Sequence, residues 1–210
     1  MIKKIFILFI IIIFSNLHAY DNYVNKIFNA IEDNDINYIK YVLENDIQSL
    51  KSRLPKDYEN NLEGATPLLY AIYNDKKDII KLFIDNIDTS YLKDRDDKNY
   101  NSIMYAAAFG NVRIMNSLVD KNENLINSKT KKNVTALHMA VVYDNIKVIS
   151  YLVKRLHVDI NAKDNDGWTA LYYAAANNKA EAYNLLIELG ADREIANNEG
   201  LKPDDIFFNN

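Results

Sequence analysis

A six-residue phrase recurs along this chain at nearly constant spacing, and it constrains the fold more than any other feature. Successive copies begin 35, 34 and 34 positions apart. A period of this length indicates one small structural unit repeated along the chain, each unit burying its apolar face against the next. The four copies are TPLLYA at Thr66–Ala71, NSIMYA at Asn101–Ala106, TALHMA at Thr135–Ala140 and TALYYA at Thr169–Ala174.

Residue types within and after the phrase predict a pair of helices in every unit. Three copies begin with threonine, whose hydroxyl can cap the free N–H groups of a helix that starts there. Pro67 stands in the first turn, where its missing N–H is not needed. The final alanines are small enough for neighbouring helices to approach closely. Four residues after each alanine comes a residue that tolerates the left-handed conformation of a tight turn, namely Asp75, Gly110, Asp144 and Asn178.

Apolar residues follow each turn at helical spacing and predict the buried side of a second helix. Gly190, which comes after Leu186 and Ile187, predicts the end of the last of these helices. The apolar stripes are Ile79, Ile80 and Phe83; Ile114, Met115 and Leu118; Val148, Ile149 and Leu152; and Leu185 and Leu186.

Degenerate copies flank the four phrases. One precedes them, with Asn25–Ala30 as its first helix and Asn34 as its turn. The surplus residues before the next phrase are expected to form an extended connection over Ile47–Asn61. At the far end the phrase restarts at Gly200, but Asp204–Asp205 replace its apolar positions. Terminal repeats are atypical in this way because one face meets water.

The phrase, its period and the run DNDGWT at Asp164–Thr169 resemble the T-P-L-H-x-A theme and the hairpin turn of ankyrin repeats. The resemblance covers most of residues 22–208. It implies an all-α ankyrin-repeat solenoid of stacked antiparallel helix pairs with projecting hairpin loops and no appreciable sheet. A tetratricopeptide array has a similar period but would not explain the hairpin run. The copy at Asn101 lacks both Thr and Pro, and only His138 keeps the family's histidine, which the family uses for hydrogen bonds between helices.

The N-terminus has the three parts of a secretory signal peptide. Lys3 and Lys4 precede ten apolar residues, Ile5–Phe14, and the small residue Ala19 follows. Ten apolar residues are too few for a membrane-spanning helix, which needs about 20. We expect cleavage after Ala19, and the alternatives are an uncleaved anchor or a buried N-terminal helix. The predicted division is a signal peptide over 1–19 and an ankyrin domain over 20–210, with an N-terminal cap repeat at about 22–60, four repeats at about 61–196 and a C-terminal cap at about 197–210.

Charge and composition narrow the classes of partner. The 210 residues contain no cysteine and carry 25 basic against 29 acidic side chains, a net charge of −4. Loss of Lys3 and Lys4 with the signal peptide would leave −6. No segment concentrates enough Lys or Arg to follow a phosphate backbone, which argues against nucleic acid. We expect a monomer without disulfides and without a membrane span after removal of the signal peptide.

Residues that could carry chemistry do not assemble into any known pattern. His157 has no second histidine or cysteine at metal spacing. Asp164–Gly167 resembles a calcium loop, but alignment on Gly167 places Ala162 at the first ligand and Tyr173 at the last, where glutamate is required. No catalytic triad or phosphate-binding loop occurs in the sequence. We therefore expect no enzyme activity, no cofactor and no metal.

The family resemblance places a partner-binding surface on the hairpin tips and on the inner face of the first helices. Aromatic residues at such positions often anchor interfaces, and we expect Trp168 and Tyr143 to do so in one shared groove. Tyr70, Tyr105 and Tyr173, by contrast, recur within the phrase and are expected to pack between helices. The hairpin residues are Asp97, Lys98 and Tyr100; Lys131, Lys132 and Val134; and Asn165, Asp166 and Trp168, and the helix residues are Tyr73, Phe109, Tyr143 and Asn177.

These features together predict an exported scaffold that binds a partner protein and performs no catalysis. Two alternatives remain at this point. One is a secreted, host-directed virulence protein, and the other is a regulatory subunit of a periplasmic enzyme. The sequence does not identify the partner.

Overall fold

Each repeated phrase opens a helix, and a second helix runs back beside it. The computed structural model describes residues 22–54, 62–109 and 111–207, and within these ranges it contains helices but no strand. A first helix over 22–32 is followed by α2 Ile36–Asn45, the 3₁₀ helix η1 Ile47–Lys51, α3 Pro67–Tyr73, α4 Lys77–Asn86, α5 Thr89–Leu92, α6 Ser102–Ala108, α7 Val112–Lys121, the 3₁₀ helix η2 Glu123–Asn127, α8 Ala136–Val142, α9 Ile146–Lys154, α10 Ala170–Ala176, α11 Ala180–Glu188 and α12 Pro203–Phe207.

The first helices begin one residue after the start of each phrase, but their capping differs. The Thr169 hydroxyl accepts the Tyr172 N–H at 3.2 Å, as predicted. Asn101 substitutes for threonine at the start of α6, because its side-chain oxygen accepts the Met104 N–H at 3.4 Å. The predicted cap is wrong for Thr66, whose buried hydroxyl has no hydrogen-bond partner among the described residues. The third residue of α3 is Leu69, whose side chain cannot accept a hydrogen bond from that hydroxyl.

The predicted left-handed turns between the paired helices are confirmed. Asp75, Asp144 and Asn178 have φ values of 49°, 57° and 54°, and Asn34 of the N-terminal repeat has 56°. Gly110, predicted for the same role, lies outside the described residues. The single left-handed residue lets the second helix reverse direction, so each pair is antiparallel.

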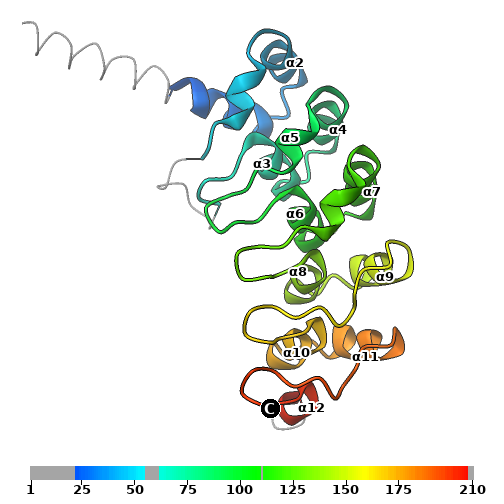
Figure 1. The fold of residues 1–210 in the computed structure, drawn as a ribbon. Helices are drawn as coiled ribbons and strands as arrows, with labels where there is room; N and C mark the ends of the chain where they lie inside the picture. Colours follow the sequence, from blue (N-terminus) through cyan, green and yellow to red (C-terminus); the bar gives the residue numbers. More distant parts are fainter. Residues whose placement is uncertain (1–21, 55–61, 110, 208–210) are drawn as a thin grey trace, which may run out of the picture.

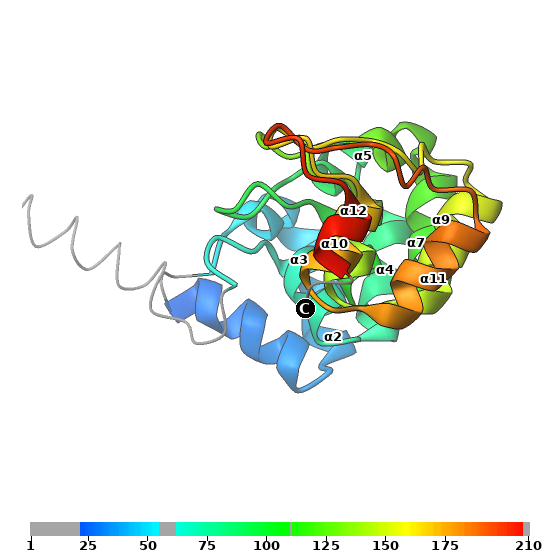
Figure 2. The ribbon, with the colours of Figure 1, turned by 90° about the horizontal axis from the view of Figure 1, so that it is seen from below.

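The helix pairs stack into two rows. The first helices α3, α6, α8, α10 and α12 pack against one another in sequence, and α2, α4, α7, α9 and α11 form the second row. Figure 2, seen along the stack, shows the rows side by side with the hairpin loops projecting beyond the first-helix row. The predicted stripes are buried, with Ile79, Phe83 and Met115, for example, at most 1% exposed, except that Leu185 is half-buried and Tyr183 takes the buried position in α11. A single continuous core therefore runs between the rows.

The connections between repeats contain short helices that the sequence analysis did not predict. Residues 47–51 form η1, so the expected extended connection is wrong in its first part, and Pro55–Asn61 lie outside the described residues. In the connections after α2, α4 and α7, a leucine turns inward toward the core. Leu50, Leu92 and Leu125 are at most 4% exposed and belong to η1, α5 and η2. Burying these side chains curls the connection into a helical turn.

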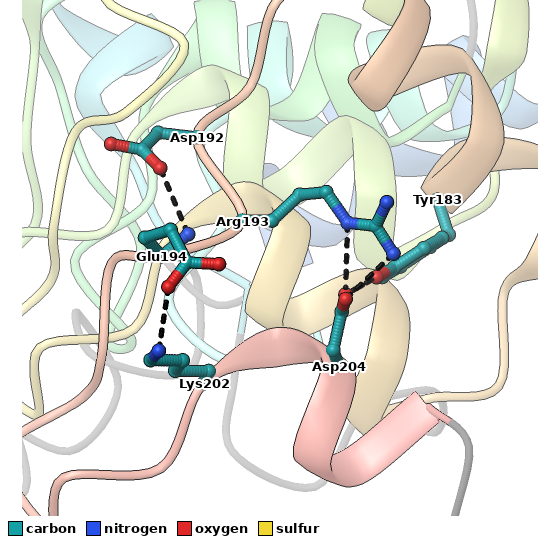
Figure 3. Close-up of polar contacts among 6 residues, drawn as sticks. All are labelled: Tyr183, Asp192, Arg193, Glu194, Lys202 and Asp204. Atoms are coloured by element: carbon teal, nitrogen blue, oxygen red, sulfur yellow. Dashed lines mark hydrogen bonds and ion pairs between the residues drawn. The ribbon is translucent and has the colours of Figure 1, made fainter.

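A polar network closes the C-terminal end of the stack (Figure 3). Asp204 occupies a position at which inner repeats carry an apolar residue. Its carboxylate accepts a hydrogen bond from the Tyr183 hydroxyl and two more from Arg193, one from Nε at 3.2 Å and one from Nη2 at 2.6 Å. Burial and the hydrogen bond to Asp204 raise the pKa of Tyr183 to about 12. The Tyr183 ring also stacks on Phe207 at 4.0 Å between centroids. The aspartate at 204 thus fastens α12 to α11 while keeping a charged group at the end of the array.

Across residues 22–54, 62–109 and 111–207, none of the helices combines the length and apolar character needed to cross a membrane. The predicted signal peptide lies outside the described residues.

Candidate protein-binding surface

The hairpin loops share one backbone conformation. In the four loops that begin at Asp96, Thr130, Asp164 and Asn197, the N–H of the first residue donates to the carbonyl of the fifth, at 3.0 Å from Asp96 to Tyr100 and from Asp164 to Trp168. The fourth residue has positive φ, which glycine and asparagine tolerate best. The positive-φ residues are Gly64, Asn99, Asn133, Gly167 and Gly200, spaced 35, 34, 34 and 33 positions apart.

Asparagine side chains join neighbouring hairpins into a wall. Asn99 Oδ1 accepts the Lys131 N–H at 2.9 Å, and Asn133 Nδ2 donates to Asn165 Oδ1 at 2.6 Å. The Asn165 N–H donates in turn to the Lys132 carbonyl at 2.9 Å. Because these bonds join one tip to the next, the predicted binding residues on the hairpins are held at fixed mutual positions.

A buried carboxylate organises the base of the fourth hairpin. Asp164 Oδ1 accepts the N–H groups of Asp166 at 2.9 Å and Trp168 at 2.8 Å, and Oδ2 accepts the Tyr173 hydroxyl at 2.8 Å. Both oxygens are therefore occupied by donors of the protein itself. This confirms that the calcium-like run forms a hairpin turn.

The second hairpin uses the same arrangement at Asp96. Its carboxylate accepts the Tyr100 N–H at 2.8 Å and the Tyr105 hydroxyl at 2.9 Å. Burial raises the pKa of Asp96, and these two hydrogen bonds offset part of the rise. The predicted packing role of the phrase tyrosines is also confirmed, because Tyr70 and Tyr105 are 3% and 4% exposed and Tyr173 is half-buried.

His138 connects the third repeat to the fourth. Its Nδ1 accepts the Thr135 N–H at 3.2 Å and lies 2.9 Å from the Thr135 hydroxyl. With Nδ1 an acceptor, Nε2 carries the proton and donates to the Trp168 carbonyl at 3.1 Å. The predicted bond between helices is thus wrong in detail: the partners are the start of its own helix and the next hairpin. Burial lowers the pKa of His138 despite the bond to Trp168.

Three of the predicted aromatic residues form a ladder across successive repeats. Ring centroids lie 4.8 Å apart between Tyr73 and Phe109, and 5.2 Å apart between Phe109 and Tyr143, with both pairs edge to face. The ladder follows the C-terminal ends of the first helices. Tyr73 is the last residue of α3, and the C-cap residues of α6, α8 and α10 are Phe109, Tyr143 and Asn177. Tyr143 ends the ladder and is 51% exposed, and Asn177 continues the row with an amide.

Trp168 belongs to a different aromatic group. Its ring lies 4.7 Å from the ring of Tyr172 and 5.3 Å from that of Tyr173, and it is half-buried. Tyr143, by contrast, contacts Phe109 of the preceding repeat. Trp168 and Tyr143 therefore belong to separate ring clusters, and the groove that they were expected to share stays a prediction.

Two cavities lie beside the hairpins, and the smaller one also contacts the ladder. A small one of about 60 Å³ lies between Tyr73, Phe109 and Tyr143 on the helix side and Lys98 and Tyr100 on the hairpin side. A larger groove of about 680 Å³ runs over the second and third hairpins and is lined by Asp97, Lys98 and Tyr100 from the former and by Lys131, Lys132 and Val134 from the latter. Most of the predicted surface thus converges on repeats two and three.

Within the described residues, no three side chains of the His, Cys, Asp or Glu types gather as metal ligands would. His157 is exposed and sits at a left-handed position of a loop, with φ of 50°. The surface is a wall of hairpins beside a row of aromatic rings, which is suited to holding another chain.

Comparison with known proteins agrees with this architecture. The model of the family described as ankyrin repeats, in three copies, matches residues 27–129 and again residues 103–197. No curated protein matches the chain at a significant level. Because the two family matches together span most of the sequence and coincide with the stacked helix pairs, the chain belongs to the ankyrin-repeat family.

Proposed function

We propose that this protein is a binding scaffold that holds a partner protein against the aromatic ladder and the adjoining hairpin wall. Ankyrin repeats are protein-interaction modules, and the observation that carries the proposal here is Tyr143. In the described residues only three large hydrophobic side chains are more than about a third exposed, and Tyr143 is one of them. Its ring packs against Phe109 of the ladder. Exposed aromatic rings on a rigid base are typical interface anchors.

We place the anchor on Tyr143 rather than on Trp168. The Trp168 ring is half-buried against Tyr172 and Tyr173, so its truncation would disturb the hairpin as well as any partner. Phe109 serves as the support beneath Tyr143. Exposure and support together make Tyr143 the residue whose loss separates binding from folding.

Tyr143→Ala is expected to weaken partner binding by about 2 kcal/mol, roughly thirtyfold, while leaving the unfolding midpoint nearly unchanged. The partner would be captured with the wild-type chain, and its affinity for both chains measured by calorimetry. Tyr41→Ala is the matched control, since Tyr41 is 56% exposed on α2, away from the ladder. Equal affinities for the Tyr143 variant and the wild type would contradict the proposal.

We further propose that the scaffold acts outside the cytoplasm. The support is the sequence pattern alone, in which Lys3 and Lys4 precede the apolar run Ile5–Phe14 and Ala19. Mass spectrometry of the protein isolated from the envelope and from the medium of the producing cell should find Tyr20 as the first residue. Recovery of chains that still contain Ile5–Phe14 would contradict cleavage and favour an anchored form. The fraction that holds the protein would separate a periplasmic role from a secreted, host-directed one.

A further inference from the structure

The groove over the second and third hairpins is strongly basic, although the chain is acidic. Five basic side chains from three separate segments line it: Arg53, Arg95, Lys98, Lys131 and Lys132. Among its other lining residues only Asp97 offers an exposed carboxylate, because Asp96 is 6% exposed and already accepts two hydrogen bonds. The whole chain has a net charge of −4, so this concentration of positive charge is local.

The arginines of this groove are positioned by the backbone. Arg53 Nη1 donates to the Gly64 carbonyl at 2.9 Å and also to the Arg95 carbonyl. Arg95 Nη1 donates to the Asn99 carbonyl at 2.6 Å. A guanidinium has five N–H donors and stays charged, so each arginine has more donors than these bonds use. Donors held in place in this way suit carboxylate recognition.

The basic groove adjoins the small cavity beside the aromatic ladder. Lys98 and Tyr100 line both the groove and the small cavity whose other wall is Tyr73, Phe109 and Tyr143. A ligand that enters the groove would therefore meet positive charge on the hairpins and aromatic rings on the helices. We infer that the partner segment held here is an acidic polypeptide that carries carboxylates beside large apolar side chains. This inference rests on the proposed scaffold function and specifies the chemistry of the partner.

A single-stranded nucleic acid fits the same surface less well. Its bases stack on open ring faces. The ladder rings instead pack edge to face, at 78° between Tyr73 and Phe109 and 61° between Phe109 and Tyr143. A long polyanion would also extend from the groove onto a surface on which acidic residues predominate. Charge complementarity is therefore limited to a short segment.

The test measures binding of the purified full chain to short synthetic peptides by fluorescence anisotropy. One peptide alternates glutamate with phenylalanine, and two others replace each glutamate with glutamine or lysine. We expect the glutamate peptide to bind at least about tenfold more tightly than the others, with an affinity that falls as salt rises. No binding of the glutamate peptide, or equal binding of all three peptides, would overturn the inference, as would tighter binding of oligothymidylate.

Charge reversal locates the site. The double variant Lys131→Glu, Lys132→Glu should lose about tenfold or more in affinity for the glutamate peptide. The control, Lys147→Glu with Lys154→Glu, makes the same change in net charge on exposed positions of α9, in the other row. Equal losses in both variants would mean that only net charge matters, and the inference would fall. A natural partner that depends on Tyr143 but tolerates the hairpin reversal would leave the scaffold function standing and refute the acidic partner.

Discussion

Gly167→Ala is expected to lower the free energy of unfolding by about 3 kcal/mol or more, whereas Gly190→Ala should cost only about 1–2 kcal/mol. Both glycines have left-handed backbone, with φ of 79° and 93°. A Cβ atom at Gly167 would lie 2.6 Å from Asn198 Oδ1 and 2.8 Å from the Asn198 backbone nitrogen. At Gly190 it would meet nothing within 4 Å. Only the first substitution must therefore displace a neighbouring hairpin.

Denaturant unfolding of the two variants checks this expectation. The Gly167 variant should show a lower midpoint, and also a smaller slope if the C-terminal cap separates from the repeats before they unfold. The contact at risk is the bond from the Asn198 N–H to the Asp166 carbonyl, at 3.0 Å. Equal midpoints for the two variants would show that the hairpins do not press on one another as the structure indicates.

Stability should also fall as the pH drops below about 6.5, and His138 should account for much of the slope. Burial holds the pKa of His138 in the folded protein below its ordinary value. Between the two values the unfolded chain binds a proton that the folded chain does not, so acid favours unfolding. The contribution is complete above the unfolded pKa and is lost as the pH falls toward the folded one. Each pH unit by which the pKa is lowered on folding corresponds to about 1.4 kcal/mol of unfolding free energy.

His138→Gln is the variant that tests this assignment. Glutamine at the third helical position can accept the Thr135 N–H in place of the imidazole, but it does not titrate. The variant should therefore keep a folded structure and lose most of the slope between neutral pH and about pH 5. His157→Gln, at an exposed loop position, is the control and should keep the slope. If the His138 variant keeps the dependence of stability on pH, that dependence must come from other titratable groups.

Single residue types at fixed positions were enough to predict much of the fold. The left-handed turns were predictable because Asp75, Asp144 and Asn178 stand at one fixed distance from an alanine, and few residues tolerate that backbone. The short helices in the connections were not predictable, because a leucine such as Leu92 is compatible both with a loop and with a helical turn that enters the core. The hairpin asparagines Asn99 and Asn133 were also missed, although their spacing matches that of the hairpin glycines and could have revealed them.

The candidate surface was predictable in its residues but not in its grouping. Phrase position placed Phe109 and Tyr143 near the ends of first helices, but their ring contact depends on side-chain rotamers that no sequence period encodes. The basic groove has a similar explanation. Arg53, Arg95 and Lys131 are separated by some 40 positions at each step, so no window of the sequence shows a cluster. Stacking of the repeats creates the charge density.

In the proposed scaffold, the row of first helices would act as a ruler for an extended partner. Packed helices lie about 8–10 Å apart, and a polyproline II chain advances about 3.1 Å per residue and returns every third side chain to the same face. Every third residue of such a partner would therefore face a new repeat, beginning at Tyr73 and ending at Asn177. The cap at Asp204 closes the stack one repeat later and limits the ruler to about ten partner residues. Such an array would select the proposed partner by the interval between its side chains as well as by their chemistry.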